Sequence, residues 1–492
     1  MRAFHVIKLN VIRRLSIVLV AMFLAACSQN QLIDLARKSP GTFISEADEV
    51  KIGAQAHPKI VAQFGGIYEN DALNSYLTNV ARRLKLHSPQ PKVPYQITIL
   101  NSSSINAFAV PGGYIYLTRG LLALANDEAE IASILAHELA HLTERHSAKR
   151  HSVAVKANII TRILQVAEED PELKRNLRIG SAGLLAQHSR DQEIEADKIA
   201  ILTAEKTGYD PYAAVSFLRT MTARKALNSK LNHANPPIEH VGFLATHPAI
   251  DLRKFKAFSF ATQVGLKPDK KKRHRNKYLK QINKLRYGSN PNQGIVRGRT
   301  FIHPLLGFRF KVPPNFRIQN RKHLVVATDP GRNVMLFDVK PSRPGADLHE
   351  VLGRHFGLGA KAWNTKRTVN NGTEMVFGAA SYRNVDHQIF LIRQKPDRIY
   401  RFWFISSPDQ TNTLSRFFEL TAKSLGPLSQ ADKRLALPRK VKIITVKPGD
   451  TVAKISERMA FADLREKRFR VLNGLSSVAR ILPGQKMKII TN

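Results

Sequence analysis

The stretch ILAHELAHLTERH, residues 134–146, decides the fold and the chemistry of the first domain. On a helix, His137 and His141 are one turn apart, so both imidazoles can reach a single metal ion. Glu138 is turned about 100° away from His137 and can instead contact a water on that ion, as a general base must. By itself, the pattern also fits a helix with two ordinary histidines. The buried side of this predicted helix is formed by Ile131, Ile134, Leu135 and Leu142.

A second segment, SRDQEIEADKIA (residues 189–200), provides the carboxylates that a zinc site needs. Glu193 and Asp197 are four residues apart on another predicted helix and therefore lie on one face of it. One carboxylate can bind the metal, while the other accepts the free N–H of a ligating imidazole and fixes its tautomer. A catalytic zinc typically has three protein ligands and one position open to water.

These motifs, together with the preceding NAFAVPGGYIYLTRGLL (residues 106–122), resemble the zinc metallopeptidases of family 48. That family includes HtpX and the CAAX prenyl proteases, and the similarity is greatest to its periplasmic BepA-like branch. It covers about residues 46–253 and implies a mainly helical, zincin-type domain with a small sheet. Glu138 is implied as the general base, and Asp197 as the acceptor of a ligand's N–H. The implied ligands of one Zn²⁺ per chain are His137, His141 and Glu193.

The stretch LATHPAIDLR, residues 244–253, adds a further histidine. In the BepA-like branch a His-Pro histidine can occupy the fourth zinc position and keep the enzyme inactive, which implies that His247 is a displaceable, inhibitory ligand. An equally weighted interpretation makes His247 only the start of a helix ahead of Pro248. Arg253 either stabilises the developing oxyanion or forms an ion pair, and the ion pair is the favoured interpretation.

The stretch SINAFAVPGG, residues 104–113, predicts a strand at the edge of the small sheet, over the catalytic cleft. An exposed edge can bind an extended peptide as an added strand through main-chain hydrogen bonds. We therefore expect Asn106, Ala107, Phe108 and Ala109 to form the edge that binds substrate. The alternative is simple hairpin packing with Phe108 in the core.

The N-terminus has the features of an exported lipoprotein. A basic leader precedes LSIVLVAMFLAA (residues 15–26), which is too short to span a bilayer because a spanning helix needs about 20 apolar residues. The run ends at Cys27, the only cysteine of the chain, so residues 1–27 resemble a lipoprotein signal peptide with a lipobox. Ser28 favours the outer membrane over the inner one. The alternative is an ordinary secretion signal. In either case a lone cysteine excludes an intramolecular disulfide.

The charge balance indicates an anionic partner. The chain has 77 Lys and Arg against 38 Asp and Glu, which gives a net charge of +39. Such a charge favours attraction to an anionic surface. An exported protein does not meet nucleic acid, so we expect lipid headgroups or cell-wall polymer as the partner, and no nucleic acid.

The chain is predicted to be an α+β multidomain protein. Its last part, ITVKPGDTVAKISERM followed by VLNGLSSVARILPGQKMKII, resembles a LysM module, a βααβ fold that binds peptidoglycan and related glycans. Alternating apolar and polar residues before it predict an α+β domain of unknown role, and a basic stretch predicts a solvated linker or a short basic helix. The predicted boundaries are 1–27 for the signal peptide, 28–260 for the metallopeptidase domain, 261–294 for the basic linker, 295–430 for the α+β domain and 441–492 for the LysM-like domain.

Together these features predict a zinc metalloendopeptidase of the bacterial envelope that cleaves unfolded or misassembled envelope proteins for protein quality control. We expect it in the periplasm, anchored to the outer membrane through lipid on Cys27 and bound to peptidoglycan through the LysM-like domain. Two alternatives stay open at this point. One is a cell-wall endopeptidase. The other is a peptidoglycan-tethered scaffold or chaperone whose zinc site is latched by His247.

Overall fold

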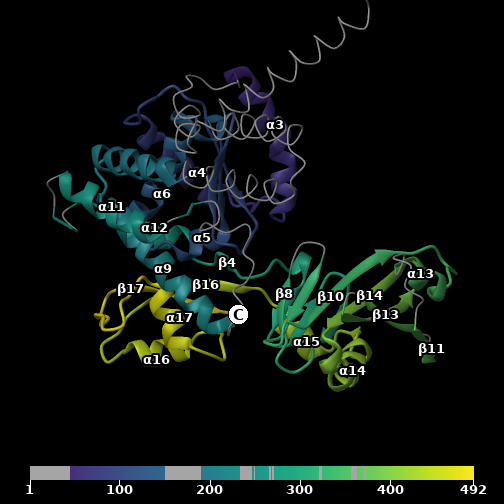
Figure 1. The fold of residues 1–492 in the computed structure, drawn as a ribbon. Coiled ribbons are helices and arrows are strands. Elements are labelled where there is room, and N and C mark those ends of the chain that lie inside the picture. Colours follow the sequence, from purple (N-terminus) through teal and green to yellow (C-terminus); the bar gives the residue numbers. More distant parts are fainter. Residues whose placement is uncertain are drawn as a thin grey trace, which may run out of the picture.

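The computed structural model defines most of the chain (Figure 1). The predicted signal peptide and Cys27 lie outside the described residues, so their assignment stays a prediction. Within the described ranges, no helix combines the length and apolar character needed to cross a membrane. The described residues are 45–149, 190–232, 247–248, 250–264, 267–268, 271–320, 324–355, 363–370, 373–382 and 384–492.

The first domain begins with two helices and a small sheet. Ser45 and Asn70 cap these helices, because each side chain accepts a hydrogen bond from a backbone N–H of the first turn. In the sheet the strand order is β1-β3-β2, with β1 parallel and β2 antiparallel to β3. β2 is therefore an edge strand, as predicted. The elements are α3 (Glu46–Gln63), α4 (Asp71–Lys85), β1 (Gln96–Leu100), β2 (Ala107–Val110) and β3 (Tyr114–Thr118).

The motif helix, α6 (Glu128–Thr143), lies in the interior of this domain. The side chain of Asp127 caps it by accepting a hydrogen bond of 2.9 Å from the N–H of Glu130. Every residue of α6 except Leu142 is buried, which is expected of a helix that is apolar on nearly all sides. It packs against α4, α9 and β2, so its polar residues face other protein groups rather than solvent. The neighbouring helices are α5 (Arg119–Leu124), α9 (Ala213–Asn232), α11 (Ile250–Gln263) and the helical residues 190–206.

Glu128, the first residue of α6, is a buried carboxylate with four partners. The hydroxyl of Tyr76 donates at 2.5 Å and that of Tyr209 at 2.7 Å, while Arg83 lies at 2.7 Å and Lys277 at 3.0 Å. Burial alone would raise the pKa of Glu128, but these hydrogen bonds and the Lys277 charge outweigh burial and lower the pKa to about 2.

This shift predicts a loss of stability in acid. A carboxyl whose pKa is lower in the folded chain than in the unfolded one stabilises the fold above its unfolded pKa of 4.5, and that contribution disappears as the pH falls toward 2. The shift corresponds to on the order of 3 kcal/mol at neutral pH. We expect Glu128→Gln to lower the free energy of unfolding at pH 7 and to flatten its dependence on pH between 5 and 2, measured by urea denaturation. An unchanged pH profile in this variant would contradict the prediction.

The basic stretch 261–294 contains a short basic helix, one of the two forms predicted for it, and is not a solvated linker. Its residues form α12 (Arg275–Gln281) and β4 (Arg286–Tyr287) and bury apolar side chains. Several of its cations pair with acids of the first domain; Arg273, for example, lies 2.8 Å from Asp127 and 2.9 Å from Asp210. The prediction counted the charges and overlooked a helically spaced apolar set between them. That buried set is Tyr278, Leu279, Ile282 and Leu285.

The middle part of the chain is rich in antiparallel sheet and lies beside the other two parts in Figure 1. A seven-stranded sheet has the order β11-β12-β13-β14-β10-β9-β8, and a second sheet has the order β15-β7-β6-β5. Phenylalanines such as Phe310, Phe337 and Phe402 fill the core, and α14 packs on β13 and β14.

The elements of this middle part run in chain order from residue 291 to residue 435. They are η1 (Pro291–Gln293), β5 (Ile295–Arg297), β6 (Thr300–His303), β7 (Phe308–Lys311), β8 (Arg317–Asn320), β9 (Val325–Thr328), β10 (Val334–Pro341), α13 (Leu348–His355), β11 (Trp363–Asn370), β12 (Thr373–Tyr382), β13 (Val385–Lys395), β14 (Arg398–Ser406), α14 (Pro408–Lys423), β15 (Gly426–Pro427) and α15 (Gln430–Leu435).

The C-terminal module packs directly on the first domain. Its strands pair antiparallel, and β4 adds a third strand, giving the order β17-β16-β4. Its apolar residues, among them Val441 and Ile490, belong to the same core cluster as Leu121 and Ile131 of the first domain. The module is therefore joined to that domain by a shared core. Its elements are β16 (Arg439–Thr445), α16 (Val452–Glu457), α17 (Arg465–Leu472) and β17 (Lys486–Thr491).

One buried lysine fixes this contact. The side chain of Lys488 on β17 is 0% exposed, and its Nζ donates hydrogen bonds to three backbone carbonyls at the end of α5. The distances are 2.9 Å to Ala123, 2.9 Å to Leu124 and 2.7 Å to Ala125. The last carbonyls of a helix lack partners within the helix, so the lysine satisfies groups that burial would otherwise leave unpaired. We call this contact the Lys488 clamp.

Candidate metal centre

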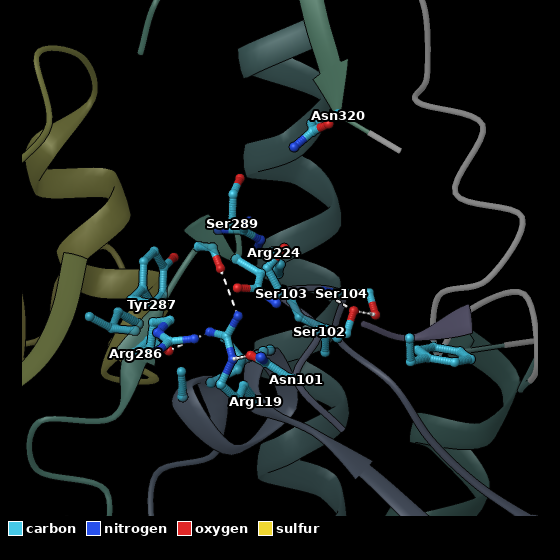
Figure 2. Close-up of a pocket in the computed structure, with 18 of the residues that line it drawn as sticks. Asn101, Ser102, Ser103, Ser104, Arg119, Arg224, Arg286, Tyr287, Ser289 and Asn320 are labelled. Atoms are coloured by element: carbon cyan, nitrogen blue, oxygen red, sulfur yellow. Dashed lines mark hydrogen bonds between the residues drawn. The ribbon is translucent and has the colours of Figure 1, made fainter. Parts of the chain in front are cut away.

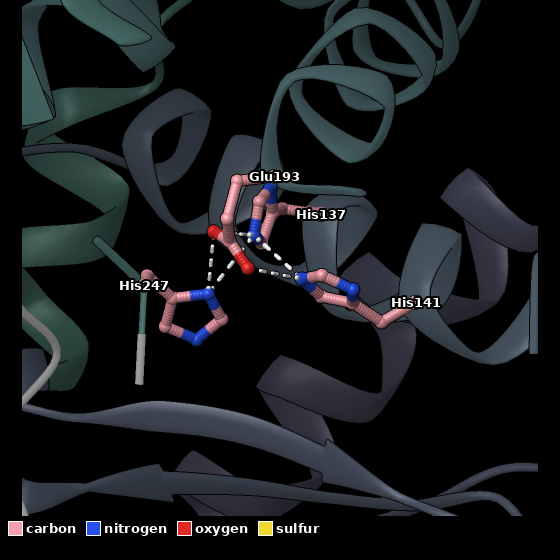
Figure 3. Close-up of side chains that lie close together, drawn as sticks. All are labelled: His137, His141, Glu193 and His247. Carbon is pink, nitrogen blue, oxygen red and sulfur yellow. Dashed lines mark hydrogen bonds and ion pairs between the residues drawn. The ribbon is translucent and has the colours of Figure 1, made fainter. Parts of the chain in front are cut away.

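Four side chains from three segments meet next to the small sheet (Figure 3). His137 and His141 come from α6, Glu193 from the helical residues 190–206, and His247 from the turn before α11. All four are buried, and one donor atom of each lies within 4.8 Å of the others. The structure thus brings together the three predicted ligands and the predicted fourth one.

The donor set fits a zinc ion. The Nε2 atoms of His137 and His141 are 3.0 Å apart, and the carboxylate of Glu193 lies 3.4 Å from the first and 3.3 Å from the second. Burial and the neighbouring His137 lower the pKa of His141 well below its usual value, so this imidazole is neutral and offers a lone pair. Imidazole nitrogens and a carboxylate that converge in a buried space are the ligands that zinc prefers.

Asp197 and Arg253 support this cluster from behind. Asp197 Oδ1 lies 3.0 Å from Nδ1 of His137, which leaves Nε2 of that ring for the metal. Arg253 holds Asp197 with two hydrogen bonds of 2.7 Å and also lies 2.9 Å from Glu193. Burial would raise the pKa of Asp197, but the Arg253 charge outweighs it and lowers the pKa to about 2. Arg253 therefore forms the ion pair that was the favoured interpretation.

The part that His146 plays was not predicted from the sequence. The motif helix ends at Thr143, and Arg145 adopts a left-handed conformation with φ of 52°, which turns the chain back. As a result Nδ1 of His146 lies 2.8 Å from Nδ1 of His141, and its Nε2 lies 3.1 Å from Glu195. This chain of contacts fixes the tautomer of His141. The five-residue spacing from His141 to His146 indicates this contact only when the position at which the helix ends is known.

Glu138 has the surroundings of a general base. Its side chain is 0% exposed, and neither carboxylate oxygen accepts a hydrogen bond from any described residue. Nε2 of His247 lies 3.5 Å from Oε1 of Glu138. Burial raises the pKa of Glu138 above its usual value. A buried carboxylate beside the ligands, with a raised pKa and unused lone pairs, can accept a proton from a water in the site.

His247 contacts both the ligand cluster and the sheet edge. Its Nδ1 lies 2.8 Å from Glu193 and 3.3 Å from Nε2 of His137, whereas its Nε2 lies 3.1 Å from the carbonyl oxygen of Ala107. That carbonyl belongs to β2 and points away from β3, toward where an added strand would pair. His247 therefore covers one hydrogen-bonding position of the edge while its other nitrogen faces the metal ligands.

The four residues predicted for the substrate edge differ in exposure. Ala107, Phe108 and Ala109 lie in β2, but Asn106 precedes the strand and is fully buried, with its carbonyl accepting from the N–H of Thr118 at 3.0 Å. Phe108 is half-buried and stacks against Phe64 and Tyr116. The hairpin packing weighed as an alternative thus coexists with an open strand edge.

A buried His-Glu-x-x-His helix, a third carboxylate ligand and an unpartnered glutamate beside them define a metallopeptidase domain. Residues 68–257 match the family model of peptidase family M48, and residues 444–489 match that of the LysM domain. The chain accordingly carries an M48 peptidase domain and, after it, a LysM domain, as the resemblances implied.

The curated relatives match about half of the chain. The putative beta-barrel assembly-enhancing protease of Vibrio cholerae is 29% identical over 246 residues, which cover 48% of this chain and 49% of that protein. The beta-barrel assembly-enhancing protease of Escherichia coli K12 is 28% identical over 270 residues, 51% of this chain and 54% of the relative. The mitochondrial metalloendopeptidase OMA1 of Schizosaccharomyces pombe is 26% identical and covers 41% of this chain and 57% of its own. The chain spans about half the length of the curated relatives it matches.

A solved structure also aligns with part of the chain. The cyanobacterial PsbP protein of Synechocystis covers 29% of this chain and 98% of its own at 15% identity, with a TM-score of 0.24. A score this low supports no conclusion about the chain.

Proposed function

We propose that this protein is a zinc-dependent metalloendopeptidase of the bacterial cell envelope that cleaves unfolded or misassembled envelope proteins. The observation that carries the proposal is the buried cluster of His137, His141 and Glu193 with the unpartnered carboxylate of Glu138 beside it. The names of the relatives support the reaction class, since they are proteases associated with beta-barrel assembly or metalloendopeptidases.

In the proposed reaction each residue has a defined task. His137, His141 and Glu193 hold one Zn²⁺, which when bound supplies a Lewis acid that polarises a carbonyl and favours deprotonation of water. Glu138 takes the proton of the attacking water and passes it to the nitrogen of the leaving amine. Asp197 and His146 keep the imidazole N–H groups pointed away from the metal. The backbone of β2 pairs with the substrate as an added strand, which gives binding that tolerates many sequences.

The proposed location and partners follow from the flanking parts of the chain. We infer that Cys27 carries lipid and holds the protein at the outer membrane on the periplasmic side, and that the LysM domain binds peptidoglycan. The turns at Gly449 and Gly484 are exposed, so docking on the first domain leaves them accessible. The net charge of +39 favours such anionic surfaces. No nucleic acid is expected as a partner.

The direct test is cleavage of an unfolded protein. Protein that begins at Ser28 is incubated with casein, with and without 1,10-phenanthroline, and zinc is then added back. We expect cleavage that the chelator abolishes and zinc restores, while a tightly folded substrate such as ubiquitin stays intact. If neither the wild type nor His247→Ala cleaves casein while binding one zinc, the peptidase proposal is wrong and the tethered scaffold replaces it. Release of peptides from purified sacculi without casein cleavage would favour the cell-wall endopeptidase.

The contacts of His247 predict that its removal increases activity. The ring faces the metal ligands and occupies the outward carbonyl of Ala107, so substrate must displace it before pairing with β2. If displacement costs about 1.4 kcal/mol, His247→Ala raises kcat/KM on casein about tenfold. His87→Ala, at an exposed histidine, is the matched control and should change nothing. A fall in activity with zinc fully bound would show that His247 assists catalysis instead of blocking it.

A further inference from the structure

A cavity with a volume of about 680 Å³, separate from the metal centre, lies where the three parts of the chain meet (Figure 2). Its walls come from the loop 101–105 of the first domain, the segment 286–290 around β4, the end of β8 and the LysM domain. It shares no residue with the metal centre and does not include the exposed turns of the LysM domain. We call it the junction pocket.

The junction pocket is strongly cationic. Arg119, Arg224, Arg286 and Arg468 line it, and none of its described lining residues is acidic. Arg119 is 1% exposed, and its guanidinium donates only to neutral oxygens: Oδ1 of Asn101 at 2.8 Å and the carbonyls of residues 286 and 288 at 2.6 and 3.0 Å. Burial and the charge of Arg286 lower the pKa of Arg119 to about 10. Charged groups are rarely buried without a partner of opposite charge.

The other three arginines are also poorly neutralised. Nε of Arg224 is buried and has no hydrogen-bond acceptor among the described residues. Arg286 forms no ion pair with any described residue, and its guanidinium lies over the ring of Tyr68. Arg468 does pair with Asp463, at 2.8 Å, but the side chain of that aspartate is 60% exposed, so solvent weakens the pair. Bringing four guanidinium groups together costs free energy, which a bound anion would offset.

The remaining lining residues suit a ligand rich in hydroxyl groups. Ser102, Ser103, Ser104 and Ser289 provide hydroxyls, and amides such as that of Asn320 add donors and acceptors. The ring of Tyr287 offers an apolar face of the kind on which sugar rings pack, whereas the ring of Phe461 is covered by the guanidinium groups of Arg439 and Arg468. The volume lies in the range of about 300–1,000 Å³ that is usual for sites of small ligands.

The loop 101–105, which carries three of these serines, is held in place by close backbone packing. Gly120 allows it to pack closely, because a Cβ there would lie 2.2 Å from the carbonyl oxygen of Ser104 and 2.3 Å from that of Ser103. Thr118 Oγ1 also donates to the Ser104 carbonyl at 2.6 Å. These contacts hold the backbone that carries the hydroxyls at the pocket wall. The loop therefore needs little ordering when a ligand binds.

We propose that the junction pocket binds a carboxylated amino-sugar saccharide, with its carboxylate on the arginines and its hydroxyls on the serine and amide groups. Muramic acid units of the cell wall have this chemistry where their carboxylate is not linked to a stem peptide. The site is separate from the glycan contacts expected of the LysM turns and does not depend on the proteolytic function, so the two proposals can fail independently.

The test measures binding by isothermal titration on the Glu138→Gln protein, which cannot digest itself. The probes are the disaccharide of N-acetylglucosamine and N-acetylmuramic acid, the neutral N,N′-diacetylchitobiose, and inorganic phosphate. We expect the acidic disaccharide to bind at least tenfold more tightly than the neutral one, and its affinity to fall as NaCl is raised from 50 to 500 mM. Arg224→Gln should weaken the acidic disaccharide about tenfold, equivalent to 1.4 kcal/mol.

The matched control is Arg219→Gln, at an exposed arginine on the same helix that does not line the pocket. It should leave the affinity unchanged. Equal affinity for the two disaccharides, or no effect of Arg224→Gln, would assign binding to the LysM turns and overturn the proposal. Phosphate that binds as tightly as the acidic disaccharide would show a simple anion site and also overturn it. If Arg224→Gln does not fold by circular dichroism, Arg468→Gln takes its place with the same expected loss.

Discussion

Glu138→Gln is expected to lower kcat on casein about 10²–10⁴-fold without loss of zinc, which is the usual range for removal of a general base. Gln has nearly the same shape as Glu but cannot accept the proton of the attacking water. Glu138 is not among the clustered ligands, and no described residue donates a hydrogen bond to it, so the exchange leaves the cluster intact. The variant also lacks the carboxyl group of Glu138, whose pKa is raised above its usual value.

The measurement pairs steady-state kinetics with zinc content by atomic absorption. Glu69→Gln is the matched control, since Glu69 is exposed and lies outside the metal centre. It should keep most of the activity. If Glu138→Gln retained more than a tenth of the wild-type kcat with one zinc bound, another group would have to be the base. A loss of zinc in this variant would show instead that Glu138 supports the ligands.

Lys488→Met should destabilise the protein by about 3 kcal/mol or more, because an unmade hydrogen bond to a buried group costs about 1–3 kcal/mol and the clamp makes three. Methionine fills similar space but has no donor, so the carbonyls of residues 123–125 lose their partner without access to water. The segment that they belong to leads directly into Asp127 and the motif helix. We therefore expect loss of activity to accompany loss of stability.

Urea denaturation followed by circular dichroism and by activity provides the readout. Lys486→Met changes an exposed lysine on the same strand and should shift the free energy of unfolding by no more than about 0.5 kcal/mol. Equal stability of the Lys488 and Lys486 variants would mean that the clamp contributes nothing. Two separate transitions in Lys488→Met would show that the LysM domain and the peptidase domain have come apart.

The sequence predicted the metal centre well because its main parts are encoded locally. His137 and His141 share a helical face through their spacing, and the same holds for Glu193 and Asp197. The edge position of β2 followed from a short strand and a Pro-Gly-Gly turn. The contact of His146 with His141 was not predicted, because it depends on where α6 ends and on the left-handed conformation of Arg145. Helix ends are among the least reliable features to derive from a sequence.

Contacts between distant parts of the chain could not be derived in this way. Nothing in the local pattern around Lys488 distinguishes it from the exposed Lys486, and two of the three hydrogen-bond partners of Arg119 lie more than 160 residues further on. The basic stretch 261–294 was misjudged for a related reason. Its charges are paired with acids whose position only the fold reveals, such as Asp127 and Asp210.

The Lys488 clamp also bears on the order in which the chain is completed as it is synthesised. The lysine lies 365 positions after the first carbonyl that it holds, so the His-Glu-x-x-His segment is made long before the residue that completes its surroundings. Contacts of such separation are slow to form because the entropy of closing a long loop opposes them. A partly synthesised chain would already contain the clustered histidines and glutamate, yet its peptidase core would still be unfinished. That core would be complete only after the LysM strands have been made.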